Sequence, residues 1–537
     1  MSVQSGRYKA ATIATLAEGW SIERLTQPSR LHGANGLRTG PDGRIYVAQV
    51  AGSQISAIDP DTGEIETISA MGGNIVAPDD LVFDDEGNLY VTEITEGRVS
   101  RLAPDGRYDV VYGETPVANP ITFHQGRLLS GECRPGGRIL ELDRNGAAPR
   151  VILEDVLMPN AFEVGPDGKL YYPVMGLNQI HRISLDGGEP EVVATDLGVP
   201  DSVKFDSKGF IVSTQVASGQ VLRIDPRTGD KQVLADIGPG LDNCTFVGDR
   251  LFVSGIDGHI HEILGEGEVK PLVERGLQWP LGLAVGGDGA LFVADGGFSY
   301  TLRPGGALEL AGMFFTSGYP GYVRDVVASG PGEWIVTTGN GDVARYRPAA
   351  GESAFLVNGL DRLMGVDVAS GGAVVVAEYG TGRILSISGG ETSELATGLD
   401  KPMGLAIGSD GTVYIAESAA GRVVKLSGGK VQTVVDGFRQ PQGIAVQGGK
   451  LYIVDTLAKD VTEYDLSAGT RRTIASALPV GAPAGVVPPL AKPVGTLAGP
   501  MIPFSGIAVG GDGTLYVAGD AEGSVLAIRR GHGVAVA

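Results

Sequence analysis

Residues 403–417 read MGLAIGSDGTVYIAE, an apolar stretch followed by a Gly/Asp turn and a second β-rich stretch. The same pattern recurs in twelve copies, which start at Asn35, Asp79, Asn119, Asn160, Asp201, Asp242, Leu281, Arg324, Met364, Met403, Gln442 and Ser505. Successive starts are 39 to 44 residues apart, except for a last interval of 63 residues. Each copy contains four strand-like runs, and four short strands in about 40 residues are typical of one blade of a β-propeller. The repeat therefore predicts an all-β fold.

The number of copies predicts the domain organisation. Twelve blades exceed the four to eight of an ordinary ring, so we expect two six-bladed β-propellers in tandem, residues 1–270 and 271–537. Within residues 8–30, one of the strand-like pieces KAATIA and WSIERL is expected to complete a sheet. The long last interval contains a Pro/Gly-rich insertion at 478–503. A surface excursion, a lid and an inter-ring contact are the alternatives for this insertion.

Composition excludes several classes of function. The chain has 84 glycines in 537 residues, which indicates many tight turns. Its net charge of −21 argues against partners such as nucleic acid or an anionic membrane, and favours a small-molecule substrate. No apolar run of membrane-spanning length and no secretion signal is seen, so a cytoplasmic location is expected. The two cysteines, Cys133 and Cys244, are expected to be buried free thiols. The oligomeric state stays open.

The two halves of the chain differ at the first residue of each copy. This residue begins the innermost strand of a blade, so six of them surround the mouth of a central channel. The first half places only Asn and Asp there, whereas the second half places mainly apolar or neutral residues. Converging carboxylate and carboxamide oxygens are the ligands that hard cations prefer. We therefore expect one divalent metal ion in the first half, Ca²⁺ ahead of Mg²⁺, Mn²⁺ or Zn²⁺, and no organic cofactor. The alternative, that Asn and Asp merely favour strand starts, predicts similar residues in both halves.

Other polar side chains are expected near the same mouth. The second strand of a blade ends there, with Gln49, Glu93, Glu132 and Gln215 in the first half and Asp295, Glu378, Glu417 and Asp455 in the second. Because both halves use such residues, a structural role competes with a role around the substrate. His32, three residues before Asn35, is a candidate substrate contact. His259 and His261 share one strand face and are candidate metal ligands, although a third ligand is not evident.

Two phrases, one blade apart, indicate a family. They are MPNAFEVGPDGKLYY around Asn160 and VPDSVKFDSKGFIVS around Asp201. Over about residues 30–265 the chain resembles the senescence marker protein, gluconolactonase and luciferin-regenerating enzyme family of six-bladed propellers. The resemblance implies that Asn160 and Asp201 bind the metal ion, that Asp201 is also the base, and that Asn119 contacts substrate or metal. The second half is similar to NHL-type repeats, as in GLAVGGDGALFVAD.

This sequence departs from the family pattern at several positions. Asn35 stands where the family has Glu, and Asp79 and Asp242 are additional acids. Ala161 and Ser202 replace the glycines that follow the two key residues.

Residues and resemblance together predict a metal-dependent hydrolase of a lactone or related cyclic ester. Asn160 and Asp201 hold the cation, with Asn35, Asn119, Asp79 or Asp242 completing its shell. Asp201 or Asp79 then deprotonates the attacking water. A metal-dependent lyase or isomerase at the same site, and a non-catalytic NHL-like binding scaffold, are the alternatives.

Overall fold

The computed structural model describes residues 7, 14–265, 267–482 and 492–531. The regular structure of this part of the chain is β, as predicted, and its only helical turns are the short η1 (Met175–Leu177) and η2 (Pro348–Ala350). The strands form twelve antiparallel sheets. Gly/Asp turns join neighbouring strands; in one of them, Gly411 adopts the left-handed φ of +81° that suits glycine. None of the described residues belongs to a helix with the length and apolar character needed to cross a membrane.

The chain divides into two compact units. The first-half unit comprises Arg30–Gln278 and Val487–Gly495. The second-half unit comprises Met1–Ser29, Trp279–Val486 and Thr496–Ala537. The boundary at 278/279 lies close to the expected one at 270/271, but the first 29 residues group with the second half rather than with the first.

The first-half unit contains six four-stranded sheets in which sequence order is also spatial order. The first three consist of β3 (Leu37–Thr39), β4 (Ile45–Gln49), β5 (Gln54–Ile58) and β6 (Ile65–Ser69); β7 (Pro78–Phe83), β8 (Leu89–Glu93), β9 (Arg98–Leu102) and β10 (Tyr108–Tyr112); and β11 (Ala118–His124), β12 (Arg127–Glu132), β13 (Gly137–Leu142) and β14 (Arg150–Val156). The other three consist of β15 (Glu163–Val164), β16 (Lys169–Val174), β17 (Gln179–Ser184) and β18 (Glu191–Ala194); β19 (Lys204–Phe205), β20 (Ile211–Thr214), β21 (Gln220–Ile224) and β22 (Lys231–Asp236); and β23 (Leu241–Val247), β24 (Arg250–Gly255), β25 (Ile260–Gly265) and β26 (Glu268–Val273).

The sixth sheet of the first-half unit packs against the first. Strand β23 contacts β3, and the hydroxyl of Ser254 on β24 donates to the carbonyl oxygen of Asn35 at 2.7 Å. Apolar side chains of both sheets, including Leu37, Val47 and Phe252, share one fully buried cluster. Burial of such apolar surface between sheets is the main source of stability for an all-β unit.

The second-half unit also contains six sheets. Three consist of β27 (Leu283–Val285), β28 (Leu291–Asp295), β29 (Phe298–Leu302) and β30 (Leu308–Met313); β31 (Val323–Gly330), β32 (Glu333–Thr338), β33 (Val343–Arg347) and β34 (Glu352–Val357); and β35 (Leu363–Val368), β36 (Val374–Glu378), β37 (Arg383–Ser388) and β38 (Glu391–Ala396). Two more consist of β39 (Pro402–Ile407), β40 (Val413–Glu417), β41 (Arg422–Ser427) and β42 (Lys430–Asp436); and β43 (Pro441–Gln447), β44 (Lys450–Asp455), β45 (Asp460–Asp465) and β46 (Thr470–Ser476), the latter extended by β1 (Thr15–Leu16). The last has β47 (Ile507–Val509), β48 (Leu515–Gly519) and β49 (Ser524–Arg530), with β2 (Trp20–Arg24) as its fourth strand.

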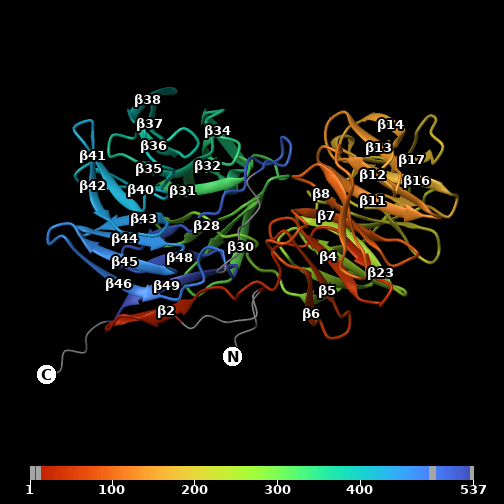
Figure 1. Cartoon of the computed structure of the whole chain (residues 1–537), viewed down its shortest axis with the longest axis horizontal. Helices are drawn as coiled ribbons and strands as arrows, with labels where there is room; N and C mark the ends of the chain where they lie inside the picture. Colours follow the sequence, from red (N-terminus) through yellow and green to blue (C-terminus); the bar gives the residue numbers. More distant parts are fainter. Residues whose placement is uncertain (1–6, 8–13, 266, 483–491, 532–537) are drawn as a thin grey trace. The chain divides into compact units, whose positions relative to one another are not determined.

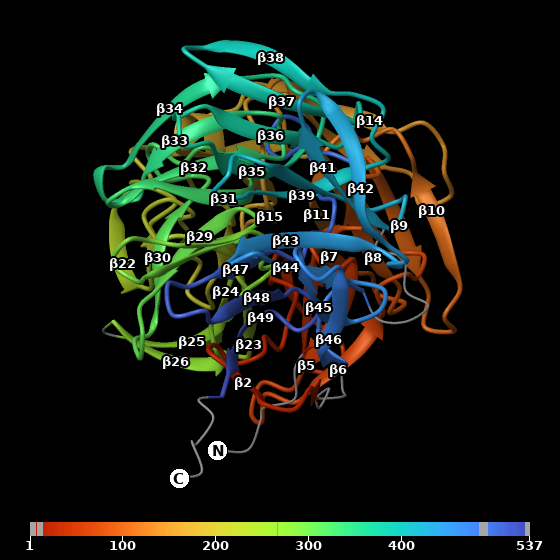
Figure 2. The same cartoon turned by 90° about the vertical axis from the view of Figure 1, so that its left-hand side faces the viewer.

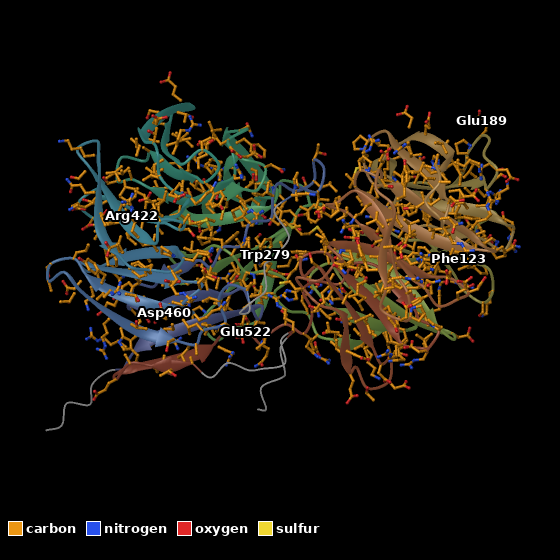
Figure 3. The ribbon with its side chains drawn as sticks, in the orientation of Figure 1. Phe123, Glu189, Trp279, Arg422, Asp460 and Glu522 are labelled. Atoms are coloured by element: carbon orange, nitrogen blue, oxygen red, sulfur yellow. The ribbon has the colours of Figure 1, made fainter. Side chains whose placement is uncertain are left out.

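The N-terminal segment completes that last sheet. Strand β2 pairs antiparallel with β49, with Ile22 opposite Ile528 (Figure 1). Arg24 on β2 also donates to Glu522, which Figure 3 labels, at 2.7 Å. The prediction that WSIERL or KAATIA completes a sheet is thus confirmed for WSIERL, while KAATIA lies mostly outside the described residues. This pairing is the reason that the first residues group with the second half.

The innermost strands of the second-half unit also follow one another in a closed cycle. Strands β27, β31, β35, β39, β43 and β47 contact in turn, and β47 contacts β27. Across the last junction, the N–H of Gly506 donates to the carbonyl oxygen of Leu281 at 3.1 Å. In Figure 2 the strands β35, β39 and β43 lie nearer the centre of this unit, whereas β34, β38 and β42 lie at its periphery.

Candidate active site

The six Asn and Asp residues at the starts of the first-half copies are all buried, with exposed fractions of 4–8%. Three of them, Asp79, Asn119 and Asp242, are the second residues of β7, β11 and β23. The other three, Asn35, Asn160 and Asp201, precede β3, β15 and β19 by two or three residues. All six therefore lie at the same end of the innermost strands.

The backbone two residues before each of these six positions is left-handed. The residues are Gly33, Ala77, Val117, Met158, Val199 and Gly240, with φ between +45° and +102°. At the matching places of the second half, only Arg362 and Lys401 have positive φ. A β-branched residue such as Val117 or Val199 is strained in this region, and such strain is concentrated at functional sites. Four of these first-half positions therefore hold a non-glycine residue in the left-handed region, against two in the second half.

Two carboxamides in the first mouth donate to two of its carboxylates. Asn160 Nδ2 donates to Asp201 Oδ2 at 2.9 Å, and Asn35 Nδ2 donates to Asp242 Oδ2 at 3.1 Å. The carbonyl oxygens of these two amides accept backbone N–H groups. Asn119 differs, because its Oδ1 is buried and has no hydrogen-bond partner. A buried acceptor left without a donor is costly, and it marks a place where a ligand atom or a cation compensates.

Burial and mutual repulsion act on the three acids. Burial raises the pKa of Asp79 and of Asp201 well above the usual range, and the neighbouring charge of Asp242 raises both further. Burial also raises the pKa of Asp242 to about 8, against the opposing hydrogen bond from Asn35. No three His, Cys, Asp or Glu side chains among the described residues are placed so that they could hold a metal ion together. The acids therefore repel one another without forming a three-carboxylate chelate, and a cation would need carboxamide oxygens as well.

Sulfur atoms form part of the surroundings of Asn160. Its Nδ2 lies 3.1 Å from Met175 Sδ, and Met175 Sδ lies 3.9 Å from Cys133 Sγ. Cys133 and Cys244 are both free and buried, as predicted. The sequence did not single out Met175, which lies in the helical turn η1 after β16.

A layer of paired charges lies next to the mouth residues. Arg38 Nη1 donates to Glu163 Oε2 at 2.8 Å, and Lys204 Nζ donates to the same oxygen at 3.2 Å. Arg38 also donates to the carbonyl oxygens of Leu81 and Ile121, so that its one side chain joins four sheets. Although burial alone would raise the pKa of Glu163, the charges of Lys204 and Arg38 lower it to about 2.

Asp80 belongs to the same layer. Its carboxylate accepts the N–H of Leu81 at 2.8 Å and that of Ile121 at 3.2 Å. Burial raises the pKa of Asp80, while the charges of Lys204 and Arg38 oppose that rise. The layer thus ties the first five sheets together beside the acidic mouth.

The same sequence alignment, read three residues further, would have found this layer. The residues at that position in the first half are Arg38, Val82, Thr122, Glu163, Lys204 and Thr245. In the second half they are Ala284, Val327, Asp367, Ala406, Ala445 and Ala508. Three of the six are charged in the first half, whereas the second half has four alanines and a single charged residue, so the halves differ here as they do at the mouth.

The residues at the end of the second strands have structural partners. Gln49 Oε1 accepts the N–H of His32 at 2.8 Å, Glu93 Oε2 accepts the N–H of Val76 at 2.8 Å, and Gln215 Oε1 accepts the N–H of Gly198 at 2.9 Å. Each of the three thereby holds the loop that leads into its own sheet. Glu132 instead accepts from the guanidinium groups of two arginines. In the second half, Glu378 and Glu417 hold their loops in the same way, which supports the structural interpretation of this position. The side chain of His32 is buried against Gly52.

The mouth of the second-half unit is filled by its own chain. Its six first residues are at most 5% exposed. Arg324 is fully buried and donates to the carbonyl oxygens of Pro500 and Ile502, while its guanidinium lies 5.4 Å from the ring of Trp279. Pro500 and Ile502 belong to the predicted insertion 478–503, of which residues 483–491 lie outside the described part. The described end of the insertion therefore covers this mouth.

Comparison with known proteins supports the family resemblance of the first half. Residues 3–127 match the family model for the SMP-30/gluconolactonase/LRE-like region. A curated gluconolactonase of Zymomonas mobilis subsp. mobilis is 28% identical over 136 residues, which is 21% of this chain and 38% of that protein. The chain thus spans about two fifths of the length of this relative. A solved X-ray structure of a candidate gluconolactonase is 18% identical and covers 48% of this chain and 95% of its own, with a TM-score of 0.38.

The extent of these matches matters for the site. The matched region contains Asn35, Asp79 and Asn119, but it ends before Asn160 and Asp201. The resemblance predicted for the first half is confirmed within residues 3–127, and the similarity of the second half to NHL repeats stays a prediction.

Proposed function

We propose that each unit is a six-bladed β-propeller and that the mouth of the first-half unit is the active site of a metal-dependent hydrolase for a lactone or related cyclic ester. Six sheets per unit, with the last packed against the first, support the architecture. The match of residues 3–127 to the gluconolactonase-like family model supports the reaction class. The second-half unit, whose mouth is covered by residues near Pro500, is assigned a supporting role.

One observation carries the proposal: six buried Asn and Asp side chains lie at the same end of the innermost strands, with the Oδ1 of Asn119 left without a partner. This donor set fits a hard divalent cation such as Ca²⁺, because it consists of carboxylate and carboxamide oxygens. Asn160 and Asp201 would hold the ion, with Asn119 and one of Asn35, Asp79 or Asp242 completing the shell. When bound, the ion would polarise the lactone carbonyl as a Lewis acid.

The protein's own groups provide the proton transfer. Asp201 Oδ2 accepts from the amide of Asn160 at 2.9 Å, which would leave Oδ1 to take a proton from the attacking water. Asp79 is the second candidate base, because it is a buried carboxylate in the same group of six residues.

A lactone screen tests this function directly. Chelator-treated protein is assayed for ring opening of sugar-acid lactones after addition of Ca²⁺, Mg²⁺, Mn²⁺ or Zn²⁺. We expect metal-dependent turnover, a product heavier by one water, and a loss of turnover by at least 10²-fold in Asp201→Asn. Asp230→Asn, an exposed carboxylate of the same sheet, is the matched control and should keep full activity.

The outcomes separate the alternatives. A product of unchanged mass would replace the hydrolase by a lyase or isomerase. If the protein bound no divalent cation and turned over no lactone, the non-catalytic binding scaffold would be the remaining alternative. An Asp201→Asn protein with full turnover would remove Asp201 from the role of base.

A further inference from the structure

A second group of polar side chains, none of them among the six mouth residues, lies at the turn between β24 and β25. His259 is fully buried there, and its Nδ1 lies 2.5 Å from Asp257 Oδ1. The other oxygen of Asp257 is 2.8 Å from Arg275 Nε. This pairing fixes the ring of His259, because the carboxylate engages Nδ1 and leaves Nε2 as the free position.

Two imidazole nitrogens, one in this turn and one at the start of β25, are buried without a hydrogen-bond partner. They are His259 Nε2 and His261 Nδ1. The two rings are 4.8 Å apart between centres and are inclined at 60°. Buried polar atoms are nearly always satisfied, so two unsatisfied nitrogens on adjacent rings point to a ligand that accepts electron pairs from both.

We propose that His259 Nε2 and His261 Nδ1 bind a first-row divalent transition-metal ion, with Zn²⁺ as the reference ion and Asp257 as the carboxylate that orients His259. A carboxylate on the far nitrogen of a metal-binding histidine is the usual arrangement around such ions. Water completes the coordination on the half-buried side of His261.

The spacing of the rings suits this role. An ion about 2.0–2.1 Å from one nitrogen of each ring lies about 3.2 Å from each ring centre, so centres 4.8 Å apart leave an angle of about 100° at the ion. Tetrahedral and octahedral coordination both tolerate that angle.

With two protein ligands, this site is expected to be weaker than a four-ligand structural zinc site. That agrees with the finding that no three His, Cys, Asp or Glu groups of the described residues are placed to hold an ion. In the proposed site, Asp257 faces the far nitrogen of His259 and is not itself a ligand.

The position of the site suggests what the ion does. The turn at Ile256 packs against the segment that precedes Asn35: a Cβ atom at Gly33 would lie only 2.7 Å from the carbonyl oxygen of Ile256. Gly33 belongs to the start of the first-half unit and Ile256 to its sixth sheet. An ion on His259 and His261 therefore fixes the turn at the place where the ring of sheets closes.

Metal titration of the full chain without an affinity tag tests the proposal. The protein is stripped with chelator and then kept in excess Ca²⁺, so that a hard-ion site in the mouth is occupied. Zn²⁺ is titrated by calorimetry and Co²⁺ by its visible absorption. We expect one Zn²⁺ per chain, a higher unfolding temperature of the first-half unit with Zn²⁺, and a 10- to 100-fold weaker affinity in Asp257→Asn.

Two variants remove the ligands one at a time. His259→Gln and His261→Gln should both lose this Zn²⁺ equivalent. If the fully buried His259 does not tolerate substitution, the variant at the half-buried His261 still tests the proposal. His181→Gln is the control, because His181 Nε2 already has Gln179 Oε1 at 2.7 Å and should not contribute. Asp201→Asn should keep the Zn²⁺ equivalent, so failure of the lactonase proposal leaves this result unaffected. Wild-type protein that binds no Zn²⁺, or full binding in both histidine variants, would overturn the proposal.

Discussion

The charged layer of the first-half unit makes a quantitative prediction for Glu163→Gln. Lys204 and Arg38 both donate to Glu163, whose pKa falls from 4.5 to about 2. A lowering of this size corresponds to roughly 3 kcal/mol of stability at pH 7, because one pKa unit is about 1.36 kcal/mol. Glutamine resembles the protonated acid and leaves both cations unbalanced. We therefore expect the equilibrium for unfolding of the first-half unit to rise roughly 100-fold in Glu163→Gln.

The sign of the pH dependence follows from the lowered pKa. The contribution of Glu163 is fully present above pH 4.5 and is lost as the pH falls toward 2. At pH 3 roughly 1 kcal/mol remains, so the difference between wild type and variant in the equilibrium for unfolding should narrow to roughly tenfold or less. A stability difference between wild type and Glu163→Gln that is equal at pH 7 and pH 3, or that is absent at pH 7, would refute the assignment of this stability to the ionised carboxylate.

The assay must distinguish the two units. All three tryptophans, Trp20, Trp279 and Trp334, belong to the second-half unit, so tryptophan fluorescence reports unfolding of that unit alone. Hydrogen exchange read by mass spectrometry on β16 and β20 reports the first-half unit. Glu191→Gln is a matched control: Glu191 also accepts from one lysine and one arginine, but on an exposed outer strand, so its loss should leave exchange in both units unchanged.

Three further changes have defined outcomes. Val199→Asn should stabilise the first-half unit by about 1 kcal/mol in urea unfolding, because asparagine tolerates the left-handed φ of +64° better than valine. The control Val192→Asn, on an extended strand, should give no gain in stability. A loss of stability in Val199→Asn would contradict the strain argument. Arg324→Met should expose residues 496–503 to proteases and destabilise the second-half unit by about 1–3 kcal/mol, because the carbonyl oxygens of Pro500 and Ile502 lose their donor. Unchanged protection of this segment from proteolysis would show that the guanidinium does not hold it. Ca²⁺ at 100 times its dissociation constant should stabilise the first-half unit of wild type by about 2.7 kcal/mol and leave Asp201→Asn unmoved, with chelator reversing the effect; equal stabilisation of both proteins would place the ion elsewhere.

The repeat predicted much of the fold because the same strand–turn–strand pattern occurs in twelve copies. Each copy pairs β-prone runs with Gly/Asp turns, and the structure contains a sheet for each copy. The register of the N-terminal strand could not be read in the same way. Strand β2 pairs with β49, more than 500 residues away in sequence, and no local pattern encodes so distant a partner.

The mouth residues were predictable because position in the repeat places them at one end of the innermost strands. Their hydrogen bonds were not predictable: which amide donates to which acid depends on side-chain rotamers, as in the pair of Asn160 and Asp201. The layer of Arg38, Glu163 and Lys204 was within reach of the same alignment. It was missed because a charged residue on a strand is normally assigned to the solvent-facing side.

The two mouths show how one scaffold position takes opposite roles. Asp201 is buried close to other acids and accepts a hydrogen bond from the neutral amide of Asn160, so its ionised form would be stabilised by a cation. Arg324 occupies the equivalent position of another blade, where the chain's own carbonyl oxygens at Pro500 and Ile502 solvate the guanidinium. A cation that is satisfied by backbone needs no ligand, whereas a group of acids that repel one another does. The charge at a single repeat position therefore separates a guanidinium that the chain itself solvates from a group of acids that a bound cation would stabilise.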